Sequence, residues 1–226
     1  MNLKSFGCSF IFGSDLADDG RNGPYATGSR LTWPALLAKD LGYNYQTHAR
    51  PGSGNLKILE TLLRESASSD SITVVVGWTW IDRFDYTVTP TDRFNHWDAA
   101  GSDQWKTIMP IDQNSLAQTY YRDLHSQFRD KLTTLIYIKT AIDTLKQKSI
   151  PFVMTYMDDL IFETEWHTTP AIVDLQDYIR PHMTTFEGQT FLNWSKQKRF
   201  PVSETLHPLE AAHQAGFELI KSYNLI

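Results

Sequence analysis

Residues 71–77 have the sequence SITVVVG and give the strongest strand signal in the chain. β-branched residues dominate this run, which lacks the alternation of apolar and polar residues typical of a half-exposed strand. A continuous apolar run indicates a parallel strand that is buried on both faces. We therefore expect residues 71–77 to be a central strand of a parallel sheet.

Strand and helix patterns alternate on both sides of this run. Short apolar segments that end in turns or polar loops predict three more strands, at residues 3–8, 43–48 and 151–156. Helical spacing of apolar residues marks four segments, at residues 32–41, 55–63, 114–148 and 208–226. The segment 114–148 predicts one long or one broken helix. This order of elements predicts an α/β fold, a three-layer α/β/α sandwich with a mainly parallel, flavodoxin-like central sheet.

Length and composition indicate a single folded domain over residues 1–226. The chain is 41% hydrophobic and 13% aromatic, which is the reverse of the composition of disordered chains. It carries 21 basic and 26 acidic side chains, and a net charge of −5 argues against a nucleic-acid partner. No apolar run is long enough to span a membrane, and the start, MNLKSFGCSF, lacks the apolar core of a signal peptide. We therefore expect no membrane partner and a cytoplasmic location.

An aromatic-rich insertion is expected at about residues 78–113, where no clear period is visible. It includes Trp78, Trp80, Trp97 and Trp105. Long segments without regular structure in a compact domain are usually functional loops. The aromatic side chains of the insertion either line a substrate cleft or form a small satellite core.

Three short blocks lie at or beyond the carboxyl ends of the expected strands, where parallel sheets bind ligands, and a fourth lies in the loop before the final helix. They are FGCSF at 6–10, PGSGN at 51–55, VVGWT at 75–79 and ETLHP at 204–208. In order and spacing, these blocks resemble those of the SGNH, or GDSL-like, hydrolase family. The residues of the first and third blocks resemble those of a divergent branch of that family, which is common in tailed phages.

The resemblance implies a catalytic triad of Ser9, His207 and Glu204. A serine hydroxyl is a poor nucleophile at neutral pH, and an imidazole is well suited to take its proton. Glu204 could accept the other ring N–H of His207 and stabilise the imidazolium. The sequence departs from the family pattern at three positions, two of them at or beside the triad: Cys8 replaces the Asp of Gly-Asp-Ser, and Glu204 replaces an Asp.

The resemblance also implies an oxyanion hole made from the Ser9 N–H, the Gly54 N–H and a side chain at position 79. Glycine at position 54 would let the backbone approach the substrate closely. Thr79 stands where the family has Asn, so that the third donor is the Thr79 hydroxyl or, in its place, the Asn55 side chain.

Other residues near these blocks have alternative interpretations. Cys8 could be the nucleophile in place of Ser9, but a thiolate needs a nearby cation or helix terminus. Residues 13–15, Gly-Ser-Asp, resemble a scrambled nucleophile motif, but they lie inside a loop and are given no role. His213 is expected to pack or bond locally. No HExxH, Walker-type or Gly-x-Gly-x-x-Gly motif occurs, so we expect neither a metal nor a nucleotide cofactor.

The sequence thus predicts a serine esterase that acts through an acyl-enzyme on a small-molecule or carbohydrate ester, such as an O-acetyl group. An O-acyltransferase on the same fold is the first alternative. The second is a catalytically silent glycan-binding or virion-associated module. The sequence does not specify an oligomeric state.

Overall fold

A four-stranded, wholly parallel sheet forms the centre of the protein in a computed structural model that describes residues 1–20, 27–67, 71–88 and 105–225. The strands are β1 (Asn2–Gly7), β2 (Asn44–Thr47), β3 (Ile72–Trp78) and β6 (Phe152–Tyr156), in the order β2-β1-β3-β6. In this order the chain leaves β1 toward one edge and returns to the other side of β1. Such a reversal opens a crevice beyond the carboxyl ends of β1 and β3.

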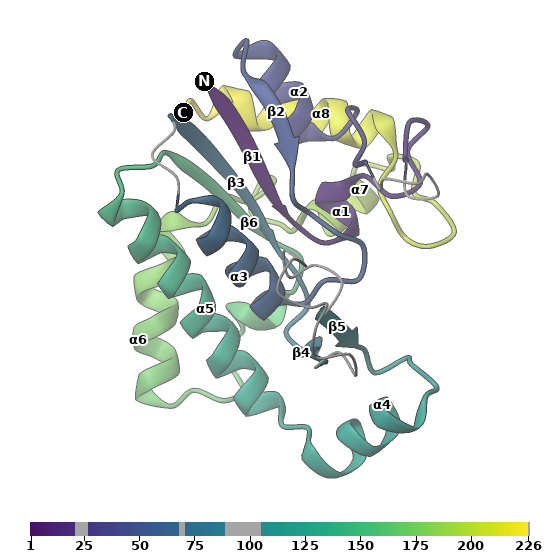
Figure 1. Cartoon of the computed structure of the whole chain (residues 1–226), viewed down its shortest axis with the longest axis vertical. Coiled ribbons are helices and arrows are strands. Elements are labelled where there is room, and N and C mark those ends of the chain that lie inside the picture. The colour runs from purple at the N-terminus through teal and green to yellow at the C-terminus, as the bar shows by residue number, and fades with distance from the viewer. Residues whose placement is uncertain (21–26, 68–70, 89–104, 226) are drawn as a thin grey trace, which may run out of the picture.

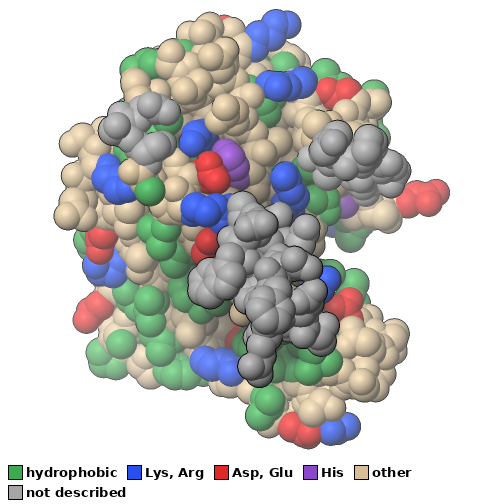
Figure 2. All heavy atoms as spheres, viewed as in Figure 1, with side chains coloured by type: hydrophobic (Ala, Val, Ile, Leu, Met, Phe, Trp, Pro, Cys, Tyr) green, Lys and Arg blue, Asp and Glu red, His purple; other side chains and the backbone are tan. Residues whose placement is uncertain are grey.

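Helices cover both faces of the sheet (Figure 1). One face carries α2 (Trp33–Asp40), α7 (Phe191–Gln197) and α8 (Glu210–Ser222), and the other carries α3 (Asn55–Glu65), α5 (Gln127–Gln147) and α6 (Pro170–Ile179). The predicted three-layer α/β/α sandwich is confirmed. Figure 2 shows the exterior from the same side, with charged side chains of both signs spread between apolar ones.

The two faces of the sheet bury separate apolar cores, and alternate strand residues supply them. Val75 packs among the residues of α2, α7 and α8, whereas Val74 and Val76 pack against α3, α5 and α6. All residues of β3 are buried. The run at 71–77 is therefore apolar without alternation because both of its faces are covered.

A pair of glycines brings the short helix α1 (Ser9–Phe12) close to the sheet. Gly7 and Gly77 are register partners at the ends of β1 and β3, and the buried side chain of Ile11 lies over both. A Cβ added at Gly77 would lie 2.6 Å from Cγ1 of Ile11. Any side chain at this position would therefore push α1, and Ser9 with it, away from β3.

We expect Gly77→Ala to lower the free energy of unfolding by about 1–3 kcal/mol, the usual cost of overpacking a core. Urea denaturation of the wild-type and variant proteins measures this loss. Because the clash is with Ile11, Gly77→Ala should cost less in an Ile11→Ala background than in the wild-type protein. Equal losses in both backgrounds would show that the contact with Ile11 is not the cause.

The chain between β3 and α5 contains two short antiparallel strands, where the sequence indicated no regular structure. They are β4 (Phe84–Thr87) and β5 (Trp105–Ile108). Ile108 packs with Ala117 and Tyr120 in a small satellite cluster. Trp97 lies outside the described residues. Polar and apolar residues alternate in β4 but not in β5, and four residues each are too few for a period to be recognised.

The expected helix at 114–148 is broken. It consists of α4 (Ser115–Thr119), the π-helical segment η1 (Tyr120–Leu124) and α5 (Gln127–Gln147). Ser126 begins α5 by accepting a hydrogen bond from the Arg129 N–H, which explains the break. Two 3-10 helices complete the described elements, η2 (Asp159–Ile161) and η3 (Arg180–His182). None of the helices in the described part of the chain is both long and apolar enough to span a membrane.

Candidate active site

Ser9 lies where β1 ends, at the first position of α1. Cys8 precedes the helix in an extended conformation, and Gly13 closes it in the left-handed conformation at φ 82°. The first amides of a helix have no acceptor within that helix, and the Ser9 N–H donates to no backbone acceptor among the described residues. Cys8 itself is fully buried, unlike Ser9, which lines a pocket. Of these two side chains, only that of Ser9 lines the pocket.

Ser9 and His207 line the same pocket, which we call the serine pocket and which has a volume of about 290 Å³. Its complete lining is Ser9, Phe10, Ser14, Pro51, Gly52, Trp80, Arg83, Met109, Leu192, Thr205, Leu206 and His207. The rings of Phe10 and His207 are in contact, with centroids 5.1 Å apart. The fold therefore brings together two residues that are almost the whole chain apart.

Asp15 holds the imidazole of His207. Its Oδ2 lies 2.7 Å from Nδ1 of His207 and also accepts hydrogen bonds from the hydroxyls of Ser203 and Thr205. A carboxylate at this distance favours the tautomer with the proton on Nδ1, which leaves the lone pair of Nε2 available. The contact with Asp15 therefore fixes one edge of the His207 ring, in a pocket that Ser9 also lines.

The turn that carries His207 is fixed by its own hydrogen bonds. The His207 N–H donates to Oγ of Ser203 at 3.1 Å, and the Ser203 N–H donates to the His207 carbonyl at 2.9 Å. Leu206 adopts the left-handed conformation at φ 66°, as does Asp15 at φ 71°. These two positions let the turn at 203–207 fold back onto the loop that contains Asp15.

The prediction that Glu204 is the partner of His207 is corrected by this geometry. Glu204 is exposed and, among the described residues, contacts neither ring nitrogen of His207. The turn directs His207 inward and leaves Glu204 in solvent. The sequence did contain Asp15, in the Gly-Ser-Asp stretch at 13–15, but no spacing linked that loop to His207.

The three residues expected to complete the oxyanion hole instead bind other parts of the protein. The Gly54 N–H donates to Oδ1 of Asp85 at 3.0 Å. Asn55 begins α3 rather than capping it, and its amide group bridges to the backbone of Thr79, with Oδ1 accepting from the Thr79 N–H at 2.8 Å. The Thr79 side chain is buried, and its hydroxyl has no partner among the described residues. None of the three lines the serine pocket.

Asp85 explains why position 54 is a glycine. A Cβ at Gly54 would lie 2.6 Å from the Asp85 carboxylate, which also accepts the Lys57 N–H and the Thr107 hydroxyl. Burial raises the pKa of Asp85, although these hydrogen bonds oppose the shift. Gly54 thus allows close approach as expected, but of a strand in the insertion rather than of a substrate.

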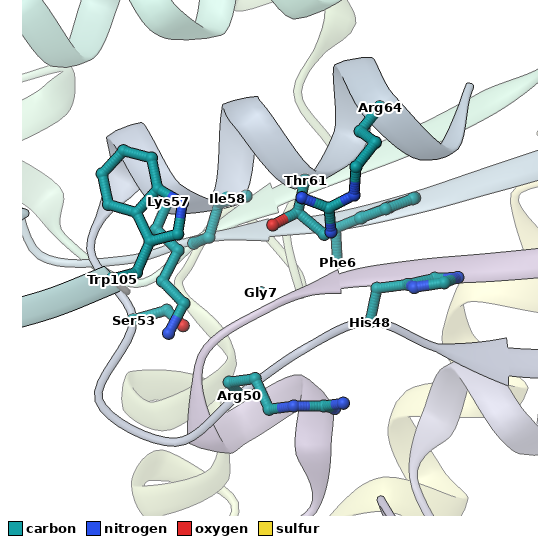
Figure 3. Close-up of a pocket in the computed structure, with 10 residues that line it drawn as sticks. All are labelled: Phe6, Gly7, His48, Arg50, Ser53, Lys57, Ile58, Thr61, Arg64 and Trp105. Atoms are coloured by element: carbon teal, nitrogen blue, oxygen red, sulfur yellow. The ribbon is translucent and has the colours of Figure 1, made fainter. Parts of the chain in front are cut away.

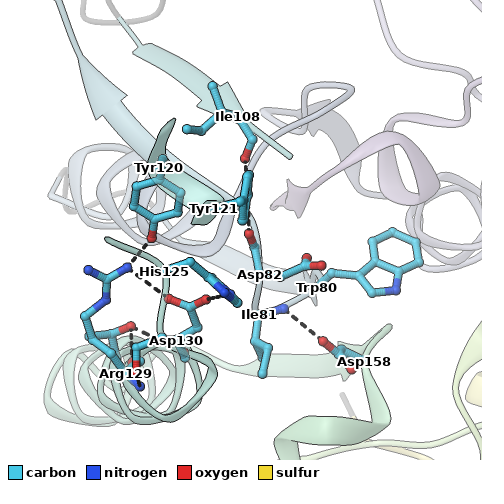
Figure 4. A network of polar contacts seen from close by, with 12 residues as sticks. Trp80, Ile81, Asp82, Ile108, Tyr120, Tyr121, His125, Arg129, Asp130 and Asp158 are labelled. Carbon is cyan, nitrogen blue, oxygen red and sulfur yellow. Dashed lines mark hydrogen bonds and ion pairs between the residues drawn. The ribbon is translucent and has the colours of Figure 1, made fainter. Parts of the chain in front are cut away.

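Further contacts fix the insertion beside the serine pocket (Figure 4). The Tyr121 hydroxyl lies 2.6 Å from the Asp82 carbonyl and 2.9 Å from the Ile108 carbonyl. The Ile81 N–H donates to the Asp158 carboxylate at 2.9 Å. Together these bonds hold the segment that contains Trp80, whose ring forms part of the serine pocket.

A second pocket is lined by basic side chains, and two of its residues, Arg50 and Ser53, flank Pro51 and Gly52 of the serine pocket in the chain (Figure 3). We call it the basic pocket. It has a volume of about 50 Å³ and its polar side chains are His48, Arg50, Ser53, Lys57, Thr61 and Arg64. No group of three or more His, Cys, Asp or Glu side chains in the described residues is placed to hold a metal ion.

His213 is buried and makes a hydrogen bond within the core. Its Nδ1 accepts a hydrogen bond from the Trp33 N–H at 3.2 Å, which requires the neutral ring. Burial, and to a lesser extent the proximity of His207, lowers the pKa of His213 to about 3. The structure therefore agrees with the expected local role.

This shift predicts that acid destabilises the protein through His213. Because the pKa in the folded state is below that of the unfolded state, the unfolded chain takes up the proton first, and stability falls as the pH drops below about 6.5 toward 3. Between pH 7 and pH 5 we expect a loss of about 2 kcal/mol from this residue. His213→Asn keeps an acceptor for Trp33, and urea denaturation of this variant should lack that part of the pH dependence. An unchanged dependence would mean that His213 is not its source.

Comparison with known proteins supports the fold. No protein-family model and no curated protein matches the sequence. Among solved structures, a member of the lipolytic G-D-S-L family from Veillonella parvula is similar, with 12% identity, a TM-score of 0.52, and 98% of this chain and 97% of that chain covered. A catalytic mutant of Axe2, an acetylxylan esterase from Geobacillus stearothermophilus, is also similar, with 12% identity, a TM-score of 0.51, and 98% and 92% covered. The chain has the fold of the GDSL, or SGNH, hydrolases, as its sequence blocks predict.

Proposed function

We propose that this protein is a serine esterase with Ser9 as nucleophile, His207 as general base and Asp15 as the acid that orients His207. One observation carries the proposal: Ser9 and His207 line one pocket, and the Asp15 carboxylate lies 2.7 Å from Nδ1 of His207. The similar fold of proteins named as esterases supports the reaction class.

The reaction follows from this arrangement in two steps. Nε2 of His207 takes the hydroxyl proton while Oγ of Ser9 attacks the ester carbonyl, and the proton then passes to the leaving alcohol. The acyl group remains on Ser9. A water molecule, deprotonated by the same nitrogen, attacks the acyl-enzyme and releases the acid and the free serine. Asp15 stabilises the imidazolium in both steps.

The oxyanion in this proposal is bound by the backbone amides of Ser9 and Gly52. Gly54, Asn55 and Thr79 take no part. The Ser9 N–H is one donor. Gly52 lines the serine pocket, and its N–H donates to no acceptor among the described residues, so it replaces Gly54 as the second donor. Removal of one such donor typically lowers the rate by about 10²–10³-fold.

The substrate class in this proposal is an ester of a carbohydrate. The half-exposed Trp80 lines the serine pocket together with Met109 and Leu192, and the guanidinium of Arg83 lies over its ring, 4.8 Å from the centroid. A lining that combines aromatic, apolar and cationic groups suits a carbohydrate. A pocket of about 290 Å³ has room for a ligand of this size. Within this class, we propose that the hydrolysed ester is an O-acetyl group.

Covalent labelling tests the assignment of the nucleophile. We expect the protein to hydrolyse p-nitrophenyl acetate and to lose activity on incubation with a reactive phosphonate ester, with one adduct on Ser9 in the peptide mass spectrum. Hydrolysis without an adduct on Ser9 would contradict the assignment. Glycan binding without any hydrolysis would instead favour the silent module, and transfer of the acyl group to an added glycan would favour the acyltransferase.

A further inference from the structure

Neighbouring residues of one short stretch of backbone line the basic pocket and the serine pocket. Arg50 and Ser53 line the basic pocket, whereas Pro51 and Gly52, between them, line the serine pocket. Gly7 also lines the basic pocket, two residues before Ser9. A ligand held in one pocket therefore contacts residues next in the chain to those that line the other.

The basic side chains come from two elements that face each other across the basic pocket. Lys57, Thr61 and Arg64 are spaced four and three residues apart and so share one face of α3. His48 and Arg50 approach from the segment after β2 (Figure 3). The arrangement gathers donors for hydrogen bonds to an oxyanion from opposite sides.

The charge of this region is opposite to that of the whole chain. The net charge of the protein is −5, yet neither pocket has an acidic side chain in its lining, and Arg83 adds a further cation to the serine pocket. Glu60 and Glu65, outside the lining, pair with Arg64. Arg50 makes no ion pair among the described residues, and its hydrogen bond goes to the neutral carbonyl of Ala49 at 2.8 Å. An incoming anion would therefore meet an uncompensated charge at Arg50.

We propose that the basic pocket binds an anionic group, a carboxylate or a phosphate, on the ester that is hydrolysed in the serine pocket. A volume of about 50 Å³ suits a group of this size and is too small for a sugar ring. The inference rests on the proposed esterase function and extends it to the charge of the substrate. The substrate is then the O-acyl ester of an acidic carbohydrate, with its anionic group in the basic pocket.

Direct binding tests the pocket separately from catalysis. Inorganic phosphate and glucuronate are titrated into the Ser9→Ala protein and followed by NMR or calorimetry. We expect at least one of them to bind, and Arg50→Gln in this background to weaken binding by about tenfold, as loss of a hydrogen bond between charged groups does. Arg64→Gln removes a charge that α3 contributes to the pocket, and it should weaken anion binding as well. Arg122→Gln removes the same charge from an exposed residue outside the pocket and should change binding less than about threefold.

Kinetics with matched esters test the link to the substrate. We expect the wild-type protein to have a higher kcat/KM for acetylated xylo-oligosaccharides that carry glucuronate than for neutral ones, by about tenfold. Arg50→Gln should lower kcat/KM for the acidic substrate by more than for the neutral one, so that the preference is lost. Anion binding without hydrolysis of any ester would refute the esterase function but support the pocket. Ester hydrolysis without anion binding would refute the pocket alone. Binding and hydrolysis without a preference for the acidic substrate would refute its role in substrate recognition.

Discussion

Ser9→Ala is expected to abolish ester hydrolysis almost completely. Without the hydroxyl, no acyl-enzyme can form, and loss of the nucleophile in enzymes of this type lowers kcat by about 10⁴–10⁶-fold. Steady-state hydrolysis of p-nitrophenyl acetate, followed by its absorbance, measures this loss. The reactive phosphonate should no longer attach to the protein.

The matched control for this variant is Ser14→Ala. Ser14 is a second buried serine that lines the same pocket, and its hydroxyl has no hydrogen-bond partner among the described residues. It follows Gly13 in the loop that carries Asp15, so it is the rival nucleophile most worth excluding. We expect Ser14→Ala to retain most of the activity. A large loss in this variant together with little loss in Ser9→Ala would reverse the assignment.

The fold was predictable because its strongest signals are local. The apolar run of β3, the Pro at the start of α2 and the helical spacing in α3 each report burial or capping of the residues that carry them. The parallel order then follows from the alternation of strands and helices. The β4–β5 pair was missed because its residues become regular only through pairing with each other across the insertion.

The positions of Ser9 and His207 were predictable only from the order of the sequence blocks and their place at strand ends. Both residues do lie in one pocket. Asp15 was not predictable in this way, because its contact with His207 joins residues separated by 192 positions through two left-handed backbone conformations. No period in the sequence records such a contact.

The oxyanion donors could not be predicted correctly for a related reason. Gly54 is a glycine because a backbone segment must be approached closely, as the sequence indicated. The group that approaches it is Asp85, which belongs to the insertion and has no counterpart in the sequence blocks. A glycine in a sequence thus predicts close approach but does not identify the approaching group.

Asp15→Asn is the second variant with a large expected effect, and Glu204→Gln is its control. An amide at position 15 can donate to Nδ1 of His207, which favours the tautomer with its proton on Nε2 and so removes the base. We expect kcat to fall by about 10²–10⁴-fold with little change in KM. Hydrolysis assays and thermal unfolding of the same samples separate this effect from any loss of folding, since Asp15 also accepts hydrogen bonds from Ser203 and Thr205.

Glu204→Gln removes the carboxylate that the sequence blocks indicated, three residues before His207. Because Glu204 is exposed and the contact with His207 is made by Asp15, we expect the activity to change by less than about threefold. The two variants together decide whether Asp15 or Glu204 is the partner of His207. A large loss in Glu204→Gln with normal activity in Asp15→Asn would mean that the turn at 203–207 rearranges in the active enzyme and exchanges one carboxylate for the other.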